Sequence, residues 1–165
     1  MKKLLKAQFK RRRQNKTDYF ARRKLLETAL PRIIARKTSR YVIAQLVESK
    51  EAQDFVICSA NSKELIKHGW PQSYSIKNIP ASYLTGFLLG KKMMQKKHNK
   101  AILDIGMTRS TKGGKIYALL KGALDAGIEI PYSKSILPSE GRIVGEHINK
   151  NFKSIFEKVK GALGK

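Results

Sequence analysis

Hydrophobic and polar residues alternate in three short runs in the first half of the chain, over residues 32–37, 41–48 and 53–60. Alternation of this kind, with a high content of Val, Ile, Tyr and Phe, is the pattern of half-buried β-strands. The connections, residues 38–40 and 49–52, are short and polar. Because connections this short join neighbouring antiparallel strands, the pattern predicts an antiparallel meander of three strands.

Apolar residues spaced three or four positions apart predict helices in much of the remaining chain. A short helix over 62–68 should end at Gly69, and a longer helix should begin near Pro80. Gly86 and Gly90 lie four positions apart in this longer helix and favour its close packing on the sheet. The apolar face of the longer helix is predicted to include Ile79, Tyr83, Phe87 and Met94.

The rest of the pattern predicts another strand and two more helices. The apolar run 101–106 is typical of a buried strand, and residues 115–126 and 151–163 have helical apolar spacing. Residues 135–149 fit neither pattern. This order of elements indicates an α/β (α+β) fold, in which a mixed sheet of three antiparallel strands plus a later strand is packed by helices.

Positive charge is concentrated at the start of the chain. The 165 residues include 35 Lys and Arg against 12 Asp and Glu, a formal net charge of +23, and residues 1–40 hold 15 of the basic residues and two of the acidic ones. Self-repulsion of this size weakens a compact state, so a polyanion is the expected partner. Residues 2–16 lack apolar periodicity and predict an arm that becomes ordered on that partner. A helix is expected from Thr17 or Asp18 until Pro31 stops it.

The charge asymmetry divides the chain into three expected parts. We expect a basic N-terminal extension with a short helix over 1–30, an α/β RNA-binding domain over 31–149, and a C-terminal helix or tail over 150–165. The apolar stretch 78–90 has 13 residues, too few to cross a bilayer, and the first residues do not form an export signal. A cytoplasmic protein without a membrane partner is therefore expected.

Candidate catalytic and metal-binding residues are few. The single cysteine, Cys58, rules out an internal disulfide and is expected in the core, and the three histidines lack the spacing of metal ligands. The order of elements is also that of nucleases of the ribonuclease H kind, which hold divalent metal with clustered carboxylates. Here the first strand has no acid, Asp104 stands alone on the later strand, and the places of Asp54 and Asp125 are not fixed by the pattern, so a nuclease is the disfavoured alternative. No catalytic residue, metal or cofactor is predicted.

Clusters of cations predict contacts with RNA or DNA, against the alternative of a solvated basic tail. The arm offers arginines for bidentate contacts with phosphate, and Tyr19 and Phe20 are available to stack on bases. Arg32 and Arg36 are expected on one face of the first strand, opposite Ile33 and Ala35. There they either extend the binding surface of the arm or simply face solvent.

The loop 108–115 is a further candidate phosphate site, because it joins a predicted strand to a predicted helix. A Walker loop requires Gly-Lys-Ser/Thr, whereas Gly114-Lys115 is followed here by Ile116. What remains is a flexible basic loop that leads into a helix N-terminus, a generic site for anions. Its predicted RNA contacts, based on charge, are Arg109, Lys112 and Lys115.

Several short motifs follow one another in a specific order along the chain. They are RRR at 11–13, TDY at 17–19, RRKLL at 22–26, PRIIARK at 31–37, AQL at 44–46, ASYLTG at 81–86, LDIG at 103–106, KGALDAG at 121–127 and IP at 130–131. Together they resemble the large-subunit ribosomal proteins of the universal eighteen family, the 5S rRNA binders, in their archaeal form. The resemblance covers residues 11–149.

The resemblance implies a structural protein without catalytic activity. Members of that family hold 5S rRNA in the central protuberance of the large subunit, near the large rRNA and neighbouring ribosomal proteins, so the chain is expected on the cytoplasmic ribosome. The open alternative is another RNA-binding or RNA-processing protein, a nuclease or an RNA chaperone. The RNA contacts that the resemblance implies are Arg11, Arg12, Arg13, Lys16, Thr17, Tyr19, Arg22, Arg23 and Lys24, with Arg36, Lys37 and Arg40 as additions.

Overall fold

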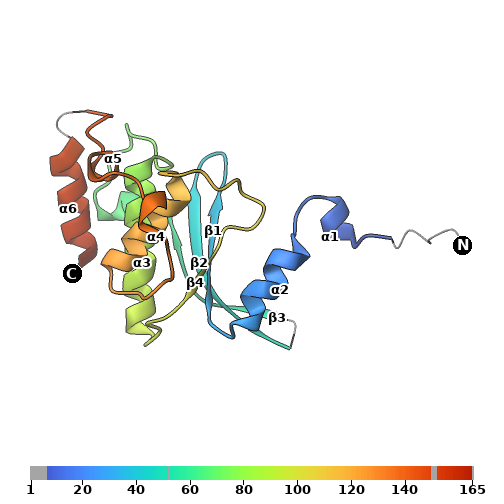
Figure 1. Ribbon diagram of the computed structural model, residues 1–165. Helices are drawn as coiled ribbons and strands as arrows, with labels where there is room; N and C mark the ends of the chain where they lie inside the picture. Colours follow the sequence, from blue (N-terminus) through green and yellow to red (C-terminus); the bar gives the residue numbers. More distant parts are fainter. Residues whose placement is uncertain (1–6, 52, 150–151, 165) are drawn as a thin grey trace, which may run out of the picture.

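A four-stranded sheet with the strand order β3-β2-β1-β4 forms the centre of the molecule (Figure 1). The computed structural model describes residues 7–51, 53–149 and 152–164. β1 pairs antiparallel with β2, and β2 with β3, whereas β4 runs parallel to β1. This arrangement confirms the predicted mixed sheet. The strands are β1 (Arg32–Lys37), β2 (Val42–Lys50), β3 (Gln53–Asn61) and β4 (Ile102–Asp104).

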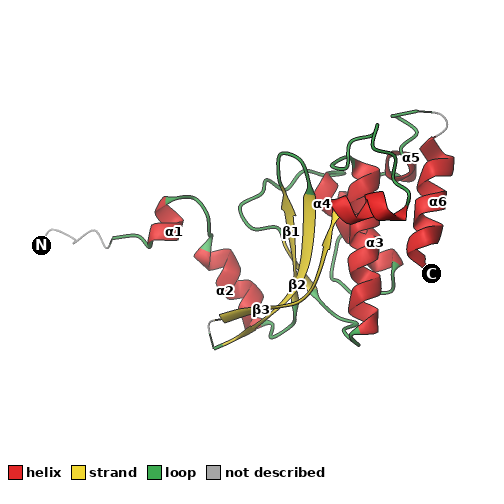
Figure 2. Ribbon diagram, turned by 180° about the vertical axis from the view of Figure 1, so that it is seen from behind, coloured by secondary structure: helices red, strands yellow, loops and turns green. Residues whose placement is uncertain are grey.

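Most helices lie on one face of the sheet, whereas α1 and α2 lie on the other side (Figure 2). α3 and α4 pack on the strands, and α6 packs on α3. The buried face of the sheet carries the alternate apolar residues of β1 and β2, for example Ile33, Ala35 and Leu46. Within the described ranges, no helix combines the length and apolar character needed to cross a membrane. The helices are α1 (Lys10–Arg13), α2 (Tyr19–Glu27), η1 (Ser62–His68), α3 (Ile79–Gln95), α4 (Lys115–Asp125), η2 (Lys134–Ile136), α5 (Glu140–Val144) and α6 (Phe152–Gly164).

Several predicted boundaries differ from the structure. The arm contains one helical turn, α1, which was not predicted, while its residues 1–6 lie outside the described part of the chain, as does the 150–151 junction before the last helix. β4 is shorter than the predicted strand over 101–106, and the unassigned segment 135–149 contains α5. The predicted cap of α2 is confirmed, because the Asp18 carboxylate accepts hydrogen bonds from the first-turn N–H groups of Phe20 and Ala21 at 3.0 and 3.3 Å.

The prediction that α3 has one apolar face was wrong. Every residue of 79–90 is buried, because α3 is packed against the sheet, α4, α5 and α6. A helix enclosed in this way needs no polar stripe. Towards its end the buried methionine is Met93, at 0% exposure, whereas Met94 is 43% exposed.

The predicted close approach of α3 through its glycines is real, but its partner is α4 and not the sheet. A Cβ atom on Gly86 would lie 1.9 Å from the carbonyl oxygen of Leu119, and one on Gly122 of α4 would lie 2.0 Å from the carbonyl oxygen of Tyr83. Both distances are far below van der Waals contact. Glycine at these positions therefore sets the distance between the two helix axes.

Replacing Gly122 by alanine should therefore lower the free energy of unfolding by about 1–3 kcal/mol, because the two backbones must separate. Urea unfolding followed by circular dichroism measures this change. The matched control is Gly161→Ala on α6, where a Cβ would meet nothing within 4 Å. The control should gain up to about 1 kcal/mol from helix propensity. Equal stability of the Gly122 variant and the unchanged protein would contradict the packing argument.

Candidate nucleic-acid interface

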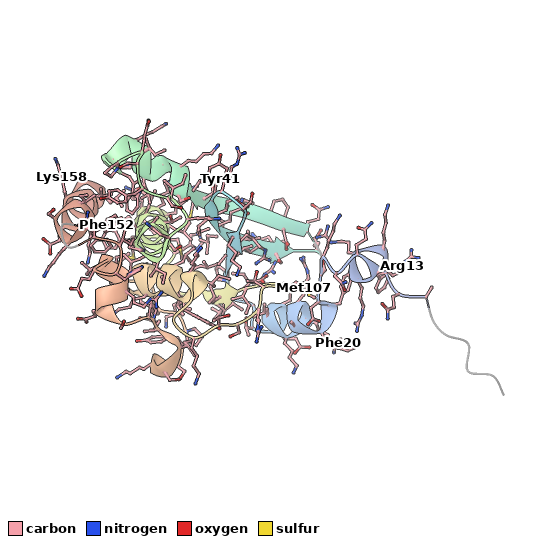
Figure 3. All side chains as sticks on the ribbon, turned by 90° about the horizontal axis from the view of Figure 1, so that it is seen from above. Arg13, Phe20, Tyr41, Met107, Phe152 and Lys158 are labelled. Carbon is pink, nitrogen blue, oxygen red and sulfur yellow. The ribbon has the colours of Figure 1, made fainter. Side chains whose placement is uncertain are left out.

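The arm and α2 project from the sheet at the end of the molecule opposite α6 (Figure 1, Figure 3). Between them and the sheet lies a groove of about 470 Å³. The β1 side chain of Arg36 and the segment 103–106 form part of its wall. The fold thus brings predicted contacts from the arm and from β1 to one hollow. The cations contributed by the arm and α2 are Arg11, Lys16, Arg22 and Lys24.

α2 is held to the sheet by polar contacts. None of the residues Tyr19–Glu27 is buried. The Arg22 guanidinium forms an ion pair with Asp54 of β3 at 2.9 Å, which joins α2 to the sheet. Within the arm, the Arg11 side chain donates to the Thr17 hydroxyl at 2.9 Å. Both contacts leave cationic side chains at the edge of the groove.

The ion pair of Arg22 is the outer end of a ladder of alternating charges across the sheet. Arg32 is 1% exposed and contacts two carboxylates, Asp54 at 2.8 Å and Asp104 at 3.0 Å. Asp104 also lies 3.4 Å from the guanidinium of Arg36. The charge ladder Arg22–Asp54–Arg32–Asp104–Arg36 contains three cations and two anions. It therefore fixes α2, β3, β1 and β4 relative to one another.

Hydrogen bonds complete the inner part of the charge ladder. The Ser49 hydroxyl accepts from Arg32 at 2.8 Å and donates to Asp54. Partial burial opposes ionisation of Asp54, but the hydrogen bond from Ser49 and the charges of Arg32 and Arg22 outweigh it, so the pKa of Asp54 lies below its ordinary value. Asp54 is thus held as a carboxylate between two arginines.

The charge ladder corrects the interpretation of the first strand. Arg32 and Arg36 share a face opposite Ile33 and Ala35, as expected. Arg32, however, neither faces solvent nor can meet a phosphate, because its side chain is 2% exposed and is already paired. Its place among the polar positions of the alternating strand pattern suggested that the Arg32 side chain is exposed. Arg36 keeps 41% of its side chain exposed and lines the groove.

The acidic residues considered for metal binding have structural roles instead. Asp54 and Asp104 are bridged by Arg32, and Asp125 accepts hydrogen bonds from Tyr83 and Lys121. Among the residues that the structure describes, no three His, Cys, Asp or Glu side chains are grouped to hold a metal ion. Cys58 is buried, as expected, and burial raises the pKa of its thiol.

Further predicted contacts of the arm and of α2 lie at the surface. The guanidinium of Arg12 lies 5.2 Å from the ring centre of Phe20, which is 70% exposed, and the Tyr19 ring packs on Phe9. Arg23 forms an exposed ion pair with Glu27 at 2.9 Å. Exposed rings beside arginines are suited to stacking on unpaired bases. Arg13 and Lys24 are also exposed.

A second hollow, of about 210 Å³, lies beside the loop between β4 and α4. It is lined by three predicted contacts, Lys37, Arg109 and Lys115. Ile105 lines both hollows, so they adjoin one another. The remaining predicted contacts, Lys112 on the loop and Arg40 in the β1–β2 turn, are exposed.

Sequence reasoning missed Ser49 and found no partner for Asp54 or Asp104. The signal available in the sequence was the presence of isolated acidic residues in a strongly basic chain. Such residues are more readily paired with a nearby arginine than left facing solvent. Their actual partners depend on the register of β3 against β2 and on the parallel pairing of β4 with β1.

Comparisons with known proteins agree with the motif resemblance. A family model described as "Ribosomal large subunit proteins 60S L5, and 50S L18" matches residues 3–100 and 95–133. A relative from Korarchaeum cryptofilum, called large ribosomal subunit protein uL18, is 52% identical over 143 residues, which is 87% of this chain and 72% of the relative. Proteins of the same name from Methanoregula boonei and Methanosphaera stadtmanae are 49% and 48% identical, over 85% and 95% of this chain and 79% and 80% of their own lengths. The chain therefore belongs to the family of ribosomal large subunit proteins 60S L5 and 50S L18.

Proposed function

We propose that this protein binds 5S rRNA through the groove between the arm, α2 and the face of the sheet opposite α3 and α4. Through this contact it helps to attach 5S rRNA to the large rRNA in the central protuberance. Family membership makes the chain a structural constituent of the large ribosomal subunit of archaeal type, with rRNA and ribosomal proteins as partners on the cytoplasmic ribosome, and not an enzyme. The observation that carries the proposal is the convergence of arm and β1 cations on one groove.

The chemistry of the groove suits RNA backbone. Arginine presents a planar fork that pairs with two phosphate oxygens, and lysine supplies a point charge. The charge ladder supports this arrangement, because Asp54 and Asp104 neutralise the buried Arg32 and hold the outer cations, Arg22 and Arg36, at the groove. Phosphate and ribose contacts position the RNA, while exposed rings read unpaired bases.

We assign a different role to each of the three expected parts of the chain. The extension over 1–30 supplies most contacts with RNA, and the domain over 31–149 supplies the scaffold and the groove wall. In the C-terminal part, expected over 150–165, α6 (Phe152–Gly164) packs on α3. The proposed contacts are Arg11, Arg12, Arg13, Lys16, Thr17, Tyr19, Arg22, Arg23, Lys24, Arg36, Lys37, Arg40, Arg109, Lys112 and Lys115.

The test is binding of the purified protein to 5S rRNA and to a tRNA of similar size, with salt raised to a few hundred millimolar. Contacts with phosphate alone lose both RNAs alike as counterions compete. Recognition of a particular RNA shape retains 5S rRNA after tRNA has dissociated, which is the expected result. Equal loss of both RNAs would refute specific binding by the protein alone. Duplex DNA that competes as well as 5S rRNA would favour a nonspecific RNA chaperone.

A further inference from the structure

Three cations from separate segments converge on the hollow beside the β4–α4 loop. They are Lys37 at the end of β1, Arg109 in the loop and Lys115 in the first turn of α4. None of the described residues that line this hollow is acidic. Among the described carboxylates, none lies within 4.0 Å of the nitrogens of these three side chains. Here the fold concentrates positive charge, whereas in the charge ladder it pairs each cation with an anion.

Lys115 lies close enough to other cations to be affected by their charge. Lys115 is partly buried, and burial followed by the neighbouring charges of Lys77 and Lys37 lowers the pKa of its ammonium group. Lys77 is itself held in place, because its ammonium group donates to the carbonyl of Ser39 at 2.8 Å. A bound anion would remove this repulsion and favour the charged form of Lys115.

The rest of the hollow offers hydrogen-bond donors. Ser110, Thr111 and Tyr117 line it with hydroxyl groups, and the hydroxyls of Ser110 and Tyr117 lie 2.5 Å apart. Gly114, the N-cap of α4, contributes no side chain to cap the first turn. The backbone N–H groups of that turn, together with the cations, favour a compact oxyanion.

We propose that this hollow is a binding site for one phosphate group, with Lys37, Arg109 and Lys115 as its charged ligands. Two sources supply that chemistry: a phosphate of an RNA backbone and free inorganic phosphate. The RNA source rests on the proposed function. The phosphate site itself does not, because it can be measured on the protein without RNA.

The experiment titrates the full-length protein with inorganic phosphate and follows the backbone amide resonances of residues 115–117 by NMR, against chloride at matched ionic strength. We expect saturable shifts at these amides with phosphate and not with chloride. Lys115→Met should weaken the phosphate affinity about tenfold, the effect of losing one charge-assisted hydrogen bond. The matched control is Lys158→Met, which removes the same charge from an exposed position on α6 at the far end of the molecule (Figure 3). Arg109→Gln, in the exposed loop, is the second variant should the Lys115 variant fail to fold.

The same titration in the presence of saturating 5S rRNA separates the two sources. Loss of the phosphate response shows that RNA occupies the hollow, and a retained response shows that free phosphate is its ligand. Both outcomes support the site. Shifts that are linear in concentration, equal with chloride, or equal in the Lys115 and Lys158 variants would overturn it, whatever the result of the 5S rRNA measurement.

Discussion

Replacing Arg32 by methionine is expected to lower the free energy of unfolding by about 3–5 kcal/mol, the cost of removing one partner of a buried ion pair. The substitution leaves Asp104, at 7% exposure, and the partly buried Asp54 without their shared cation. Methionine fills a similar volume, so the loss reports the missing buried cation more than a cavity. Guanidinium chloride unfolding at neutral pH, followed by circular dichroism, measures it.

The matched control is Arg36→Met, at the exposed end of the same charge ladder. Its side chain is 41% exposed and its guanidinium lies 3.4 Å from Asp104, so solvent screens the pair and the loss should be no more than about 1 kcal/mol. Similar losses for the two variants would contradict the assignment of Arg32 as the centre of the charge ladder.

Acid should reduce the difference between the Arg32 variant and the unchanged protein. The pKa of Asp54 is depressed in the folded state, so its stabilising contribution is complete above the pKa of the unfolded chain. That contribution is lost as the pH falls through the folded-state pKa, because the unfolded chain binds the proton more tightly. In the variant the part of this contribution that comes from Arg32 is already missing, while the parts from Ser49 and Arg22 remain. The two unfolding free energies should therefore approach one another below the ordinary pKa of aspartate.

The strands of the sheet were predictable because their hydrophobic pattern matches the way their side chains are buried in the fold. Residues 33–36 of β1, 42–46 of β2 and 57–61 of β3 alternate between the core and the opposite face of the sheet, so the period of two identifies the strands. The pattern fails for α3, which is buried on all sides through residue 90, and it cannot show which element α3 packs against. The approach of Gly86 to Leu119 brings together residues 33 positions apart, and sequence spacing alone does not determine such a contact.

The candidate site was predictable as a list of residues, but its geometry was not. Cation content and motif order identified Arg11 and Arg22, whereas the groove also requires α2 to dock on Asp54, 32 residues further along the chain. Arg32 shows the limit most clearly. It belongs to the same basic segment as Arg36, yet the partners supplied by β3 and β4 make it part of the scaffold.

Changing Arg11, Arg12 and Arg13 together to alanine should weaken 5S rRNA binding about a hundredfold and reduce the slope of log affinity against log salt by about 2. Arg11 lines the groove, Arg12 lies beside Phe20 and Arg13 is exposed, so each can meet phosphate and none is buried. The domain should keep its circular dichroism and unfolding midpoint, because α1 contributes nothing to the core. Filter binding across a salt series measures both effects.

Two further variants separate charge from geometry in that result. Changing the three arginines to lysine keeps the charge and removes the bidentate fork, so the salt slope should stay the same while affinity falls. Changing Lys67, Lys153 and Lys158 to alanine removes equal charge from exposed positions outside the arm and should leave the 5S rRNA affinity nearly unchanged. If this control lowers affinity and slope as much as the arginine variant, the arm acts only through the net charge of the protein. If only the arginine variant lowers the affinity and the salt slope, the three arginines of the arm contact phosphates locally, and 5S rRNA binding depends on those contacts.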